Sequence, residues 1–99
     1  MDKQRMIDRM YAGDRDAIMF GIASHRPILV MNAIMAGTKA EIRDERFLVG
    51  ISRAKESEEI LLGIPLKKVA VASEHLLGVK KYAGDDRTIL AMIRSGFGI

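Results

Sequence analysis

Apolar residues recur every three to four positions along most of the 99-residue chain, which is the spacing that gathers them on one face of an α-helix. Residues typical of helix starts and ends divide this pattern into seven segments. The first apolar stripe runs from Met6 to Tyr11 and stops before Gly13. Asp14 is a good N-cap for a second helix, which we expect to end near His25.

The run Pro27–Gly37 predicts a third helix, because the fixed φ of proline suits the first helical turn. Since this run is apolar nearly all round, we expect the helix to be central. Thr38 and Glu41 have the spacing of a capping box, in which each side chain satisfies a free backbone N–H at the helix start. They predict a fourth helix from about Lys39 to Lys55.

Three further helices are expected in the rest of the chain. Ser57 can cap a short one through residues 58–62. Pro65 opens a sixth that Gly78 closes, and Asp85 caps a seventh. A competing interpretation makes residues 28–31 or 68–72 strands of an α+β domain. Both runs follow a proline and continue into a longer helical stripe, which favours helices.

Two segments of the chain are similar to each other. Tyr11–Ile22 aligns without gaps on Tyr82–Ile93, sharing the opening Tyr-Ala-Gly-Asp and both Ile positions. Their offset of 71 residues (82 − 11) is two intervals of 35.5, within the range of helical repeats. Pro27 and Pro65 are offset by 38, so the repeat is irregular. The sequence thus predicts an all-α fold in one domain, residues 1–99: a short α-solenoid, or right-handed stack of antiparallel helix pairs, with about six to seven helices.

One segment resembles the second helix of a HEAT-like repeat. Residues 65–70, Pro-Leu-Lys-Lys-Val-Ala, lead to Leu-Leu-Gly at 76–78; Lys68 stands where the family often has Arg, and Ala70 at the family's small position. Helix pairs at this spacing would cover residues 14–95, although Val30 and Asn32 depart from the pattern at the matching places. The resemblance implies a stack that binds other macromolecules along one face.

Composition supports one folded domain in a reducing compartment. Apolar residues make up 48% and charged residues 29%, as in globular proteins, and a chain of this length builds a single core. The absence of cysteine favours the cytoplasm. Charges spread through residues 1–11 do not predict a secretory signal, and the most apolar stretch, residues 27–36, is half the roughly 20 residues that cross a bilayer. We therefore expect no membrane partner.

Residues suited to catalysis or metal binding are few. His25 and His75 are fifty residues apart and lack ligand-type partners at short spacing. The acidic pairs Asp14/Asp16 and Asp85/Asp86 could do acid–base chemistry if buried, but they stand at predicted helix starts, where capping explains them. We expect no catalytic residue, no metal and no cofactor, and hence a protein that is not an enzyme.

The excess positive charge lies in the last third of the chain. Residues 1–66 hold ten Lys and Arg against ten Asp and Glu, whereas residues 67–99 hold six against three. The six are candidates for contact with a partner: Lys67, Lys68, Lys80, Lys81, Arg87 and Arg94. The leading hypothesis is a non-enzymatic protein–protein interaction module or scaffold; the alternative is a nucleic-acid-associated protein that uses these residues.

Two apolar residues follow the last predicted helix. Phe97 and Ile99 close the sequence, and apolar side chains at a chain end need cover. We expect them to fold back onto the core or to form a homodimer contact.

Overall fold

The computed structural model describes residues 2–98 and is mainly helical. Its described part contains six α-helices: α1 (Lys3–Tyr11), α2 (Arg15–Ile22), α3 (Pro27–Lys39), α4 (Glu45–Ala54), α5 (Leu66–Leu76) and α6 (Arg87–Ser95). A small antiparallel hairpin of β1 (Ile60–Leu61) and β2 (Ile64–Pro65) precedes α5, and a short 3₁₀ turn, Gly96–Gly98, follows α6. The predicted helical character is confirmed, and neither run considered as an alternative strand is extended, since residues 28–31 lie in α3 and residues 68–72 in α5.

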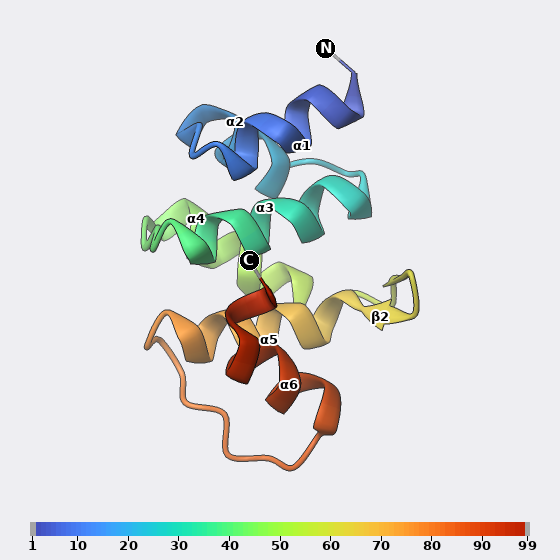
Figure 1. Cartoon of the computed structure of the whole chain (residues 1–99), viewed down its shortest axis with the longest axis vertical. Helices are drawn as coiled ribbons and strands as arrows, with labels where there is room; N and C mark the ends of the chain where they lie inside the picture. Colours follow the sequence, from blue (N-terminus) through green and yellow to red (C-terminus); the bar gives the residue numbers. More distant parts are fainter. Residues whose placement is uncertain (1, 99) are drawn as a thin grey trace.

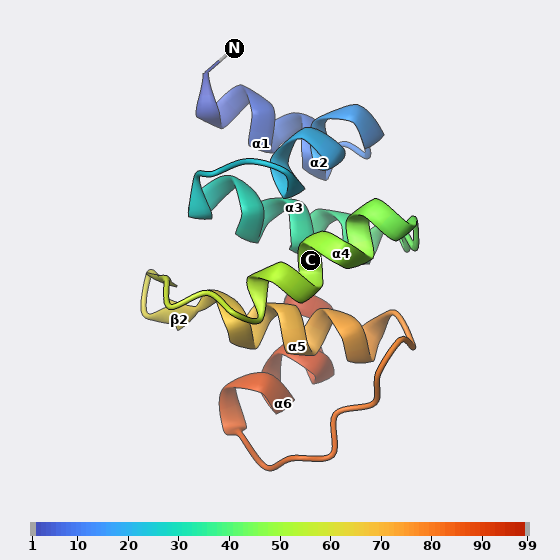
Figure 2. The ribbon, with the colours of Figure 1, turned by 180° about the vertical axis from the view of Figure 1, so that it is seen from behind.

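Five of the helices form two layers. Figure 1 shows α1, α3 and α5 following one another along the long axis of a molecule that measures 39 × 25 × 23 Å. Seen from behind, α2 and α4 cover them as a second layer (Figure 2). The starts of α2 and α4 lie side by side, because Arg15 in the first turn of α2 forms an ion pair with Asp44, the residue before α4.

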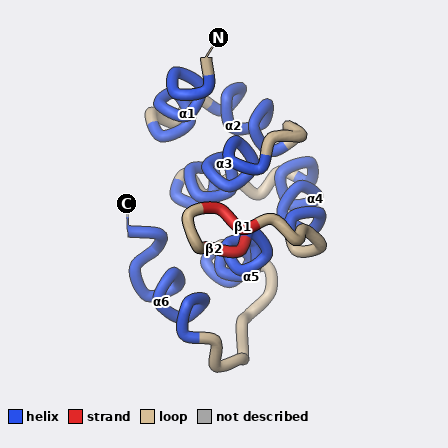
Figure 3. Tube along the Cα trace, turned by 90° about the vertical axis from the view of Figure 1, so that its right-hand side faces the viewer, coloured by secondary structure: helices blue, strands red, loops and turns tan. Residues whose placement is uncertain are grey.

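The sixth helix departs from this alternation. Figure 3 shows α6 on one side of α5 and α4 on the other. The loop of residues 77–86 returns along α5 instead of making a short turn, so that Asp86, at the start of α6, pairs with Lys68 in the first turn of α5 at 2.8 Å. The last helix pair is therefore not a hairpin of the kind that the repeat pattern predicts.

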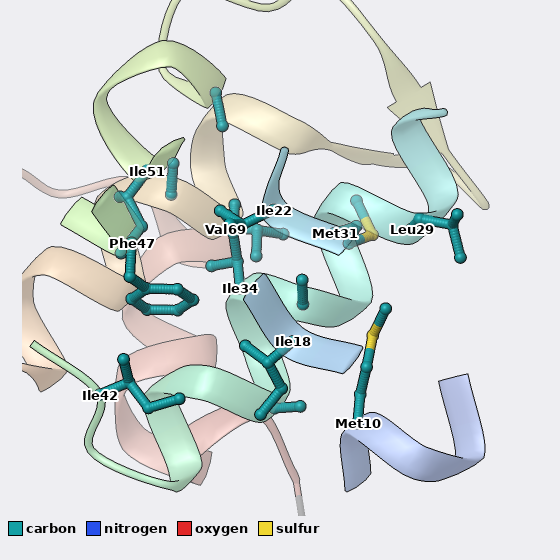
Figure 4. Close-up of a cluster of buried hydrophobic side chains, with 14 of the residues drawn as sticks. Met10, Ile18, Ile22, Leu29, Met31, Ile34, Ile42, Phe47, Ile51 and Val69 are labelled. Carbon is teal, nitrogen blue, oxygen red and sulfur yellow. The ribbon is translucent and has the colours of Figure 1, made fainter. Parts of the chain in front are cut away.

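The core is built around α3. Figure 4 shows side chains of α1, α2, α4 and α5 converging on Ile34 of this helix. The largest fully buried apolar side chains are Phe47, Met10, Ile18, Ile34, Ile51 and Val69. Gly37 lets the ring of Phe47 lie against the α3 backbone, since a Cβ at this position would overlap that ring. The prediction that the Pro27 helix is central is confirmed.

The predicted capping box at Thr38 is wrong. The third helix does not stop at Gly37 but continues to Lys39, and α4 begins only at Glu45. Thr38 is buried inside α3, where its hydroxyl donates a hydrogen bond to the carbonyl of Ile34 at 2.6 Å. Its burial against α5 decides its role, and a capping motif read from local sequence does not register such a tertiary contact.

The predicted short helix after Ser57 is also wrong, because residues 60–65 form the hairpin. Leu62 and Gly63 both have positive φ, at 53° and 78°, as the two central residues of a tight hairpin turn do. The Ser57 hydroxyl accepts a hydrogen bond from the backbone N–H of Glu59 at 3.1 Å, which turns the chain instead of starting a helix. Glycine after an unbroken apolar run allows this turn as readily as it ends a helix.

The predicted helix caps are correct at one repeat position and shifted at the other. Asp14 caps α2 by accepting a hydrogen bond from Ala17 N–H at 3.1 Å. The matching cap of α6 is Asp86, which accepts from Ile89 N–H at 3.0 Å, and not Asp85. Ile18 and Ile89, which the repeat aligns, are both buried. The two segments thus place equivalent isoleucines in the core from helix starts that differ by one residue.

Candidate protein-binding surface

Two adjoining hollows open on the layer formed by α2 and α4. One, of about 280 Å³, lies between the two helices, and the other, of about 670 Å³, follows the outer side of α2 and the loop after it. Met19, Ala23 and Arg46 line both, so the hollows are continuous. We call their combined lining the α2–α4 surface: Asp16, Met19, Phe20, Ile22, Ala23, Ser24, His25, Arg26, Glu45, Arg46, Val49, Gly50 and Arg53.

Two apolar side chains of this surface stand out in solvent. Phe20 on α2 is 61% exposed and Val49 on α4 is 49% exposed. Helical register determines both orientations: α2 buries Ala17, Ile18, Gly21 and Ile22, and α4 buries Phe47, Gly50, Ile51 and Ala54. Both side chains thus project from the opposite faces of well-anchored helices. Aromatic side chains are enriched at protein–protein interfaces relative to the rest of the surface.

Two arginines flank Val49 on α4. Arg46 precedes it by three residues and Arg53 follows it by four, so the three side chains share one helix face. Neither arginine forms an ion pair with any residue between 2 and 98. With Arg26, the α2–α4 surface contains three arginines and two acidic residues, Asp16 and Glu45. Its net charge is +1 with histidine neutral.

Close packing holds the two helices in place. A Cβ at Gly50 would overlap the side chain of Ile22, so α4 approaches α2 closely only because this residue is glycine. At the helix starts, the hydrogen bond and the charge of Asp44 raise the pKa of the Arg15 guanidinium. The apolar and basic side chains are therefore presented by helices whose spacing is fixed at both points.

Sequence reasoning missed this surface. Residues 17–22, Ala-Ile-Met-Phe-Gly-Ile, are apolar on every side, so the pattern alone places Phe20 among the buried residues of its helix. A signal was present, because Ala17, Ile18 and Ile22 share one helix face and Phe20 points away from it. Nothing in the local pattern tells which of the two apolar faces a neighbouring helix covers.

The basic residues proposed from the sequence lie at two ends of α5. Lys67 and Lys68 occupy its first turn, and the contact between Lys68 and Asp86 brings Arg87 to the same end. Lys80 and Lys81 are exposed in the loop beyond the other end, and an eleven-residue helix is about 16 Å long. The structure divides these lysines into two groups, and a role in nucleic-acid binding stays a prediction.

The remaining predicted residues lie near the end of the chain. Arg94 is exposed in the last turn of α6. Phe97 is half-buried and packs against the core. Ile99 lies outside the described residues. A homodimer contact through these positions stays a prediction.

The histidines and paired acids have structural partners or are exposed. His75 Nδ1 accepts a hydrogen bond from the backbone N–H of Tyr82 at 3.0 Å, and His25 is exposed in the loop after α2. The hydrogen bond from Ala17 N–H, followed by that from Arg9, lowers the pKa of Asp14. A hydrogen bond from Lys68 does most to lower the pKa of Asp86. No group of three His, Asp or Glu suited to a metal ion occurs in the described part of the chain.

Comparisons of the sequence with protein-family models and curated proteins, and of the chain with solved structures, find no match. Among the helices that the structure describes, none has the length and apolar character needed to span a bilayer.

Proposed function

We propose that this chain is a non-enzymatic interaction module that binds an acidic, amphipathic helical segment of a partner protein on its α2–α4 surface. The observation that carries the proposal is the exposed ring of Phe20 beside an α4 face bearing Arg46, Val49 and Arg53. Large apolar side chains with arginine neighbours are enriched at the centres of protein–protein interfaces.

The layering of the helices supports a role as a short α-solenoid of the HEAT-like kind. The helices α1, α3 and α5 succeed one another in one layer and α2 and α4 in the other (Figures 1 and 2). Stacks of this kind bind partners along an extended face formed by one layer. In this proposal α2 and α4 supply that face, and α6 closes the stack on the opposite side of α5 (Figure 3).

The chemistry of the surface selects its occupant. A bound helix with apolar side chains at positions i, i+3 or i+4, and i+7 would cover Phe20, Val49 and the floor at Met19. Carboxylates on the flanks of that helix would reach Arg46 and Arg53. Each arginine can form a bidentate hydrogen-bonded ion pair with a carboxylate. Such a partner buries the apolar side chains and supplies the counter-charges that the described residues do not.

A selection from a displayed library of random peptides tests the proposal. The wild-type chain is expected to enrich acidic peptides with helical apolar spacing, and a Phe20→Ser/Arg46→Glu/Arg53→Glu variant is expected to lose them. A Lys80→Glu/Lys81→Glu variant is the matched control, because it reverses two exposed positive charges far along the chain from the α2–α4 surface. Peptides that bind the wild type and the triple variant equally would overturn the proposal.

A nucleic-acid arm separates the two hypotheses drawn from the sequence. Random duplex and single-stranded DNA are mixed with the chain at low and high salt and followed by electrophoretic shift. Binding that disappears at high salt and in the Lys80→Glu/Lys81→Glu variant, together with no enriched peptide, would favour the nucleic-acid role over the proposed one.

A further inference from the structure

Another hollow lies on the opposite layer of the molecule from the α2–α4 surface. It has a volume of about 310 Å³ and lies between α3, α5, α6 and the end of the hairpin. Among the described residues that line it, none has a charged side chain, and they include three methionines and an aromatic ring: Met31, Met35, Met92 and Phe97. We call it the methionine groove. Unbranched methionine side chains adapt their shape to an inserted apolar group.

The hairpin beside this groove carries the two most exposed of the large apolar side chains that the structure describes. Leu62 at its tip is 95% exposed and Ile60 is 63% exposed. Leu62 has a φ of 53°, a left-handed conformation that residues other than glycine, asparagine and aspartate rarely adopt. Asparagine and glycine are the residues that this kind of turn favours at both central positions. A leucine at this position lowers the stability of the isolated chain. It gains almost no packing contact in return, because its side chain is exposed.

We propose that a second copy of this chain covers both features, with Leu62 of each copy inserted into the methionine groove of the other. The tip and the groove are neighbours in one molecule, because Ile64, which directly follows the turn of the hairpin, also lines the groove. Figure 3 shows the hairpin facing the viewer in front of α5, with α6 on one side of it. A two-fold axis that passes between tip and groove brings each tip to the partner's groove, so that a single rotation makes both contacts.

The lack of charged side chains on the hairpin and in the groove favours a second copy of this chain over a charged partner. Residues 60–65, Ile-Leu-Leu-Gly-Ile-Pro, contain no charge, which matches the uncharged lining of the groove. An acidic or basic partner would leave its charges without counter-ions there. The methionine groove and the α2–α4 surface share no lining residue, so this inference stands apart from the proposed function.

Sedimentation velocity over a series of protein concentrations tests the proposal. The wild type is expected to reach twice its chain mass of 11.0 kDa as the concentration rises. Leu62→Asn is expected to stay monomeric while folding at least as well, because asparagine tolerates the left-handed turn. Ala91→Glu places a charge on an exposed groove residue of α6 and is also expected to stay monomeric. Val79→Asn, an exposed apolar residue of the loop after α5, is the matched control and should dimerise like the wild type.

Mixing the two monomeric variants tests reciprocity. Ala91→Glu keeps its tip and Leu62→Asn keeps its groove, so an equimolar mixture is expected to form a weak heterodimer through one remaining contact. The absence of any heterodimer, a wild type that stays monomeric at every concentration, or a dimer that survives Leu62→Asn would each overturn the proposal. So would a Leu62→Asn variant whose only defect is lost binding to phosphatidylcholine/phosphatidylserine vesicles.

Discussion

The hydroxyl oxygens of Thr38 in α3 and Ser73 in α5 lie 2.5 Å apart, and both side chains are buried. Thr38 also donates to the Ile34 carbonyl, so Ser73 is the donor in the bond between the two hydroxyls. The contact joins residues 35 positions apart in the sequence, and it ties the central helix to the one on which the hairpin and α6 are built. The bond contributes to the free energy of unfolding because both hydroxyls are buried. A hydroxyl that lost its partner there could not form a hydrogen bond with water instead.

Replacing Thr38 with valine keeps the shape and removes the hydroxyl. Ser73 is then left without its acceptor in the core, and the free energy of unfolding is expected to fall by about 1–3 kcal/mol. Urea denaturation followed by circular dichroism measures it. Thr88→Val, at an exposed position of α6, is the control and should change stability far less. A Thr38→Val/Ser73→Ala double variant that is no more stable than Thr38→Val would contradict the pairing.

Gly37 tests how tightly α3 packs against α4. In an exposed helix interior, alanine in place of glycine raises stability by about 1 kcal/mol. At this position the added methyl group would overlap the Phe47 ring and approach Ile18 Cγ2 to 3.2 Å. Gly37→Ala is therefore expected to lower the free energy of unfolding by about 1–3 kcal/mol. The melting temperature should fall accordingly. A higher melting temperature would show that Phe47 does not lie where the structure places it.

Acid is expected to weaken the starts of α2 and α6. The folded state lowers the pKa of both Asp14 and Asp86, so the unfolded state binds more protons than the folded one at low pH. The stability that these carboxylates contribute is complete above the unfolded pKa, near 3.9, and is lost as the pH falls through the lower folded values. Thermal melts between pH 2 and pH 7 should therefore show a smaller acid loss in an Asp14→Asn/Asp86→Asn variant. An equal loss in both proteins would exclude these two groups as its source.

The exposed side chains of the α2–α4 surface are expected to matter for binding and not for folding. Phe20→Ser and Val49→Ser should each change the free energy of unfolding by no more than about 0.5 kcal/mol, because neither side chain is in the core. Ile18→Ala, two residues before Phe20 but on the buried face of α2, is expected to cost about 2–5 kcal/mol. Thermal melts of the three variants compare them directly. A large loss in Phe20→Ser would mean that the ring is part of the core.

Helix starts with an explicit signal were predictable from the sequence. Asp14, Pro27 and Pro65 each mark a real boundary, because a capping carboxylate or a fixed proline φ acts within one turn of the chain. Thr38 carries an equally good local signal and is not a cap. Its role is set by Ser73, and no pattern within a few residues of Thr38 encodes that partner.

The site depended on features that local patterns do not reveal. Residues 58–63 suit a short helix and a hairpin equally well, and the choice rests on Leu62 accepting a left-handed backbone. The position of α6 rests on the Lys68–Asp86 pair and on a ten-residue loop whose path the sequence does not state. Phe20 looks like a core residue until the placement of α4 shows which face of α2 is covered.

Amide chemical-shift mapping of the labelled chain, titrated with the peptide most enriched in the library selection, locates the residues that contact the peptide. Binding on the α2–α4 surface predicts that the largest shifts fall on residues 19–26 of α2 and its following loop and on residues 45–53 of α4, and that they vanish in the Phe20→Ser/Arg46→Glu/Arg53→Glu variant. Shifts centred instead on the methionine groove, or on the lysines at the two ends of α5, would contradict binding at this surface.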